Sequence, residues 1–96
     1  MGFWSDVGNF FGNAIEVDEW GKAFEKGGQS LVQVHIRNFL RASSKEERDR
    51  KRDRLATLST YTGNGLDAMQ RFATIHAIFL DEEATMKEER RKRREK

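Results

Sequence analysis

The first pattern of hydrophobic and polar positions along the chain covers residues 3–15. Seven apolar side chains there recur every three or four positions, and at 100° per residue they fill one arc of about 160°. Gly8 and Gly12 border this arc and weaken the helix by roughly 1 kcal/mol each. The pattern predicts an amphipathic N-terminal helix that needs a second surface to fold against. Its apolar residues are Phe3, Trp4, Val7, Phe10, Phe11, Ala14 and Ile15.

A second helical pattern covers residues 17–42, where large apolar side chains again recur at helical spacing. Gly27 and Gly28 predict a break or a kink within this helix. Residues 32–37 also alternate between apolar and polar and are rich in β-branched side chains, which is typical of a strand. A helix is the main prediction for this stretch. A strand that pairs with residues 58–62 is the alternative.

Two further helices are predicted in the C-terminal half of the chain. Ser44 and Glu47 form a capping box, which marks the start of a helix. The glycine–asparagine–glycine run at residues 63–65 supplies a stop and a turn, after which the last helix continues into the tail. We therefore predict an αα-hairpin of residues 44–62 and 66–94. The whole chain is expected to be one domain with an all-α fold of three or four helices, in which the N-terminal helices pack across the hairpin.

The last helix is apolar over an arc of about 200°, far wider than the roughly 100° stripe of an ordinary surface helix. Two groups of side chains form this arc, one on each side of His76. They are Leu66, Met69, Ala73, Ala77 and Leu80, and Ala68, Phe72, Ile75 and Phe79.

A helix that is apolar over so wide an arc has to be covered on two sides. A chain of 96 residues offers few covering surfaces, so we expect a second copy or a partner protein to supply one. The predicted protein interface consists of Phe3, Trp4, Val7, Phe10, Phe11, Ile15, Phe72, Ile75 and Phe79.

No residue pattern typical of an enzyme or a metal site occurs in the sequence. The absence of cysteine excludes a disulfide framework, a thiolate metal site and a cysteine nucleophile. No serine lies in a nucleophile elbow, and no phosphate-binding glycine motif is present. His35 and His76 lack a second ligand at helical spacing, and the acidic run at residues 81–83 is interpreted as a solvated helix face. We predict a protein that is not an enzyme and binds no cofactor, metal or small-molecule substrate.

The net charge of +2 conceals two basic segments. Residues 43–54 hold six basic and four acidic side chains, whose alternation is typical of a solvated helix face with many ion pairs. Residues 87–96 hold seven basic and three acidic side chains, and the five consecutive cations exceed what a helix end requires. These segments are the candidate contacts for an acidic protein, nucleic acid or an anionic membrane. The alternative for the tail is a helix end that only makes the protein more soluble. The candidate residues are Arg48, Arg50, Lys51, Arg52, Arg90, Arg91, Lys92, Arg93 and Arg94.

The favoured functional hypothesis is a helical protein–protein interaction module that forms a homo-oligomer and acts as an adaptor, inhibitor or structural accessory. The first alternative is nucleic-acid binding through residues 48–54 and 90–94, although the interleaved acids repel phosphate. The second is a peripheral membrane protein anchored by residues 3–15, although residues 1–21 hold four acids and no base. Since the N-terminus lacks the pattern of a signal peptide and no apolar run approaches the roughly 18 residues of a membrane span, a cytoplasmic protein is expected.

Overall fold

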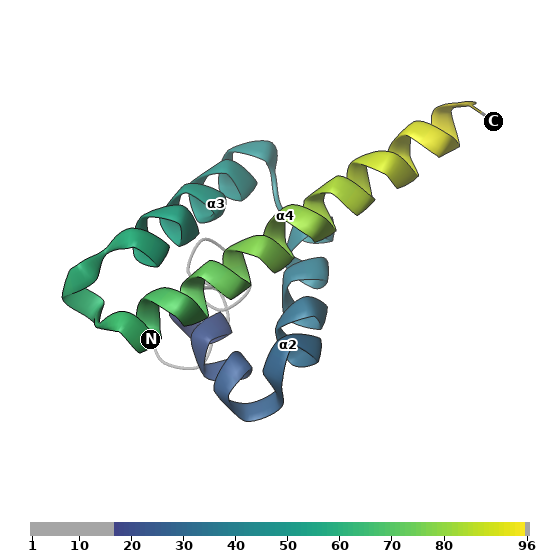
Figure 1. Cartoon of the computed structure of the whole chain (residues 1–96). Coiled ribbons are helices and arrows are strands. Elements are labelled where there is room, and N and C mark those ends of the chain that lie inside the picture. Colours follow the sequence, from purple (N-terminus) through teal and green to yellow (C-terminus); the bar gives the residue numbers. More distant parts are fainter. Residues whose placement is uncertain (1–16, 96) are drawn as a thin grey trace, which may run out of the picture.

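The computed structural model describes residues 17–95 of the chain (Figure 1). The predicted helix over residues 3–15 lies outside the described residues. No helix in the described part combines the length and the apolarity needed to cross a membrane. Residues 17–95 contain no strand, and the predicted all-α fold class is confirmed. The elements are α2 (Val17–Ala42), α3 (Lys45–Thr60), the 3-10 turn η1 (Thr62–Asn64) and α4 (Leu66–Glu95).

Helix α2 bends at Gly28 into two arms, which Figure 1 shows as the two limbs of a sharp turn. Gly28 has φ 67° and ψ −159°, a backbone conformation that is essentially restricted to glycine. No heavy atom of the fold lies within 4 Å of the place that a Cβ atom would take at Gly28. The requirement for glycine is therefore one of backbone conformation and not of space. The predicted kink at Gly27 and Gly28 is confirmed.

Residues 32–37 belong to the second arm of α2, so the strand alternative for this stretch is wrong. Val32 and Ile36 are one helical turn apart and are fully buried, whereas Val34 is half exposed. The sequence alternates here because the exposed Val34 lies midway between the two core positions, Val32 and Ile36. Burial of the two core side chains, and not strand pairing, explains their identity.

The start of α3 follows the capping box that the sequence predicts. The backbone N–H of Glu47 donates to Ser44 Oγ at 3.2 Å, and the backbone N–H of Ser44 donates to Glu47 Oε1 at 3.0 Å. The helix ends at Thr60, and Gly65 takes φ 91° immediately before α4 begins. The start of α3 is thus set by a local signal that is visible in the sequence, and Gly65 marks the turn that precedes α4.

Helix α4 lies between the other two helices and contacts both, whereas α2 and α3 contact each other little. Figure 1 shows α3 alongside the first half of α4, the second arm of α2 on its other side, and the end of α4 projecting beyond both neighbours. Trp20 and Phe39 come from the two arms of α2, and both pack against Phe79 of α4. The ring centroids of Trp20 and Phe39 are 5.5 Å apart. The ring centroid of Phe79 lies 6.0 Å from that of Trp20 and 6.4 Å from that of Phe39. The remaining buried apolar residues are Val17, Ala23, Val32, Ile36, Leu40, Leu55, Leu58, Phe72 and Ile75.

Phe72, Ile75 and Phe79 were expected at a protein interface, and the structure places them in the core of the chain instead. Their exposed fractions are 7%, 0% and 0%. The expectation failed because one half of the wide apolar arc of α4 is already covered by α2 and α3. These three residues are part of the core and are not accessible to another protein.

Substitution Gly28→Ala is expected to destabilise the fold by about 1–3 kcal/mol, the cost of holding a non-glycine residue in this backbone conformation. For a domain of this size, the loss corresponds to a fall of several degrees in the midpoint of thermal unfolding. Circular dichroism at rising temperature measures it. Gln29→Ala changes an exposed neighbour within the second arm and serves as the control. Equal midpoints for the two variants would show that the bend at Gly28 is not required.

Candidate anion-binding cleft

Two adjacent glutamates of α4 connect it to its neighbours on both sides. Glu82 and Glu83 have exposed fractions of only 7% and 6%, so the interpretation of residues 81–83 as a solvated face is wrong for these two. Arg37 Nε of α2 donates to Glu82 Oε1 at 2.7 Å, and Gln33 Nε2 donates to Glu82 Oε2 at 3.4 Å. Consecutive helical residues point about 100° apart, so the next carboxylate along the chain is directed towards the opposite neighbour.

That opposite neighbour is α3, whose Arg52 binds Glu83. Arg52 Nη1 donates to both carboxylate oxygens of Glu83, at 2.9 and 3.0 Å, and Arg52 Nη2 donates to Asp49 Oδ1 at 2.8 Å. Arg48 of the same basic segment donates through Nη1 to the backbone carbonyl of Ser43 at 2.9 Å. Arg48 and Arg52, both predicted contacts for an anionic partner, are therefore occupied in holding the fold together.

The hydrogen bond from Arg37 holds the pKa of the Glu82 carboxyl below its ordinary value. Burial acts in the opposite direction, while the hydrogen bond from Gln33 and the charges of Arg37 and Arg41 add to the lowering. Glu82 therefore stays ionised, and its negative charge lies at one end of a cleft that opens beside it.

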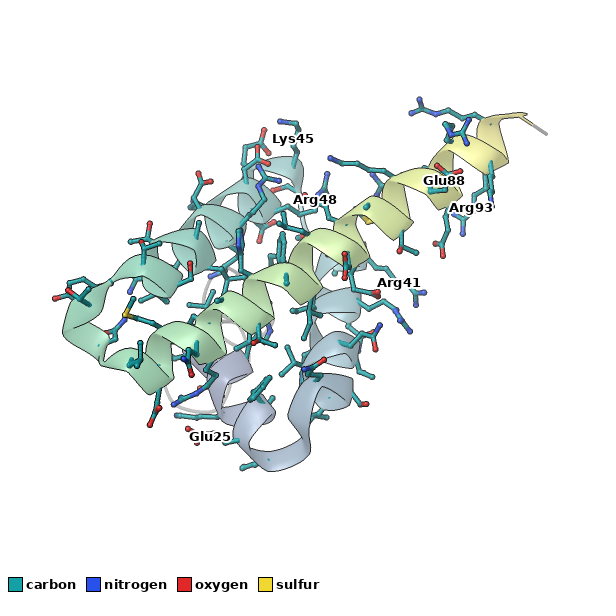
Figure 2. All side chains as sticks on the ribbon, in the orientation of Figure 1. Glu25, Arg41, Lys45, Arg48, Glu88 and Arg93 are labelled. Atoms are coloured by element: carbon teal, nitrogen blue, oxygen red, sulfur yellow. The ribbon has the colours of Figure 1, made fainter. Side chains whose placement is uncertain are left out.

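This cleft has a volume of about 250 Å³ and lies between the second arm of α2 and the projecting half of α4. The buried Leu40 and the partly buried Met86 contribute apolar surface to it. The polar side chains of each helix reach the cleft together, because positions three or four residues apart lie on the same face of a helix. Figure 2 shows Arg41 and Arg93 on the same side of the projecting half of α4, in the angle that it forms with α2. The polar lining consists of Arg37, Arg41, Glu82, Thr85, Glu89, Arg90 and Arg93.

The charge of the cleft is positive and only partly compensated. Four arginines and two glutamates line it, and one arginine, Arg37, is already paired with Glu82. The ion pairs found among the side chains of residues 17–94 include none for Arg41, Arg90 or Arg93. These three guanidinium groups converge on one cleft and can bind carboxylate or phosphate oxygens in a bidentate manner.

The structure divides the remaining predicted anion-binding residues into separate groups. Arg90 and Arg93 line the cleft, whereas Arg91 pairs with Glu88 at 2.6 Å on the projecting helix. Lys92, Arg94 and Arg50 are exposed outside the lining of the cleft, and Lys51 is half-buried. Of the predicted interface residues, Phe3, Trp4, Val7, Phe10, Phe11 and Ile15 lie outside the described residues.

Sequence reasoning missed the contribution of α2 to this site. Arg37 and Arg41 are four residues apart and face the same way, which the sequence does show. Nothing in the sequence indicates that they face the basic tail 50 residues further on, because this depends on how α2 packs on α4.

Comparisons with protein-family models, with curated proteins and with solved structures found no match to this chain.

The lowered pKa of Glu82 makes the stability of the fold depend on pH. A carboxyl whose pKa is lower in the folded state stabilises that state above its unfolded pKa, and the stabilisation is lost as the pH falls through the folded pKa. The free energy of unfolding should therefore decrease from about pH 5 downwards, and Glu82→Gln should make this decrease shallower, because the variant has no carboxyl to protonate there. Urea unfolding at a series of pH values measures both slopes. Glu46→Gln, at an exposed position of α3, is the control, and a wild-type slope in Glu82→Gln would contradict the role of the pair.

Proposed function

We propose that the chain is a non-enzymatic protein-binding module that captures an acidic, partly apolar segment of another protein in the cleft between α2 and α4. The observation that carries this proposal is the convergence of Arg41, Arg90 and Arg93 on a cleft that Leu40 and Met86 also line. Such a surface offers two kinds of contact at once. Arginine forks bind carboxylates, and the apolar surface accepts an aliphatic or aromatic side chain.

The two acids in the cleft favour a protein partner over nucleic acid. Glu82 and Glu89 line the same space as the arginines, and each repels phosphate. A nucleic-acid strand carries a phosphate at every nucleotide and cannot avoid these positions. A peptide can place its carboxylates opposite the arginines and neutral or basic side chains opposite Glu89. Mixed charge together with an apolar surface is thus better matched by a protein segment.

The projecting half of α4 supports the same proposal. It extends beyond α2 and α3 (Figure 1). Residues 87–96 at its end carry a net charge of +4, which attracts an acidic partner from a distance and accelerates association. An adaptor or an inhibitor needs only such a surface, because it acts by occupying part of its partner.

The double variant Arg41→Gln/Arg93→Gln should weaken binding of an acidic amphipathic peptide by about tenfold or more, since the loss of about 1.4 kcal/mol corresponds to a factor of ten. The probe is a synthetic helical peptide with glutamate and leucine at helical spacing, and fluorescence anisotropy measures its affinity. A peptide in which glutamine replaces every glutamate tests the need for carboxylates.

The matched control is Arg50→Gln/Arg54→Gln, which removes the same charge from exposed positions of α3. Equal weakening by both double variants would mean that only net charge matters, and the cleft would not be the site. Binding to single- or double-stranded DNA that is stronger than peptide binding, falls steeply with salt and is lost in the cleft variant would favour the nucleic-acid alternative instead.

A further inference from the structure

The outer face of α4 carries an apolar stripe that neither α2 nor α3 covers. Leu66 is 67% exposed and Leu80 is 43% exposed. Ala73 and Ala77 are also exposed, and Met69 is partly exposed. At 100° per residue, these five side chains fall within an arc of about 80°. They form one of the two groups of the wide apolar arc, and this group lies outside the core.

The spacing within this stripe is symmetric about Ala73. From Leu66 to Leu80 the steps are three, four, four and three residues. If a second copy of α4 lies antiparallel across a two-fold axis at Ala73, each position meets its counterpart at an equal distance from the centre. Leu66 then lies beside Leu80 of the other copy, and Met69 beside Ala77.

This arrangement also matches large side chains with small ones. The two Ala73 residues meet at the axis, where small side chains let the helices approach closely, and each Met69 fills the space above an alanine. Interfaces with two-fold symmetry require such self-complementarity of one surface patch. An unrelated partner would place no such condition on the order of residues along the stripe.

Charge selects the antiparallel orientation. Residues 87–96 of one copy have a net charge of +4. In a parallel pair these segments would run side by side, at the roughly 8–10 Å separation of packed helices, where like charges repel even at physiological salt. In the antiparallel pair they project from opposite ends.

We infer that the protein forms a two-fold symmetric, antiparallel dimer through the outer face of α4, with Ala73 at the axis. The stripe is about 21 Å long at 1.5 Å per residue, so its interface lies at the small end for specific complexes. The dimer therefore dissociates on dilution. The inference goes beyond the proposed function, because the stripe shares no residue with the cleft.

Sedimentation velocity of the full chain over a wide range of concentration tests the dimer. The wild type should pass from one chain to two as its concentration rises. Ala73→Arg places two like charges at the axis and should remain a monomer throughout, with an unchanged thermal midpoint at low concentration. The control Thr57→Arg introduces the same charge at an exposed position of α3 and should dimerise as the wild type does.

Two outcomes would overturn the inference. One is a wild type that stays monomeric at every concentration. The other is a lower thermal midpoint for Ala73→Arg than for the wild type, measured at a low concentration at which both are monomers. That result would mean that another part of the same chain, such as residues 1–16, covers the stripe. Neither outcome depends on peptide binding, so this test and that of the proposed function fail separately.

Disulfide cross-linking determines the orientation of the two helices. The natural chain has no cysteine, so each introduced cysteine is the only thiol in its chain. A mixture of Leu66→Cys and Leu80→Cys chains should form mainly the mixed disulfide under mild oxidation. Disulfides only between identical chains would indicate a parallel pair and overturn the antiparallel arrangement. Thr57→Cys chains, whose position lies outside the stripe, should remain largely unlinked.

Discussion

The packing of Phe79 against Trp20 and Phe39 is the constraint on which the rest of the structure depends. These three rings join both arms of α2 to α4, and both arms can reach Phe79 only if α2 reverses its direction between them. Gly28 provides that reversal through a backbone conformation open to glycine. The bend then directs the second arm across α4, where Gln33 and Arg37 reach Glu82. The position of the cleft, and with it the approach of Arg41 to Arg93, is therefore a consequence of an aromatic contact made in the core.

The paired carboxylates of α4 complete this arrangement through charge. Glu82 accepts hydrogen bonds from α2 and Glu83 from α3, so a rotation of α4 by one residue would leave a buried carboxylate facing an apolar neighbour. An unpaired buried charge is costly, whereas a paired one contributes little net stability. We interpret the two pairs as fixing the rotation and the register of α4 between its neighbours. The pair of Glu82 with Arg37 also neutralises one arginine of the cleft and leaves the other three available.

Local signals in the sequence predicted where the helices begin and bend. Which side chains are buried or paired depends on tertiary packing, which the sequence does not reveal. Ser44, Gly28 and Gly65 act on the backbone next to them, so the start of α3, the kink of α2 and the start of α4 could be predicted without knowledge of the fold. The wide apolar arc of α4 was recognised, but the sequence does not say which half of it the chain itself covers. Phe79 was therefore assigned to an interface, and Glu82 to solvent. The basic tail was predicted only as a contact for an anionic partner, whereas its position opposite Arg41 depends on the bend of α2.

Helix α4 uses two of its faces for three purposes. The face that builds the core continues along the projecting half as the wall of the cleft, and the outer face carries the symmetric stripe. In the proposed antiparallel dimer the two-fold axis passes through the middle of the stripe, so the two projecting ends point in opposite directions. Each dimer then presents two arginine clefts at its two ends. A partner with two acidic segments at a matching separation would bind both clefts, and the second contact would form at a high effective concentration. A weak dimer and a modest cleft, each sufficient only for transient binding alone, would in this way reinforce each other, because a bivalent partner bridging the two chains also holds the dimer together.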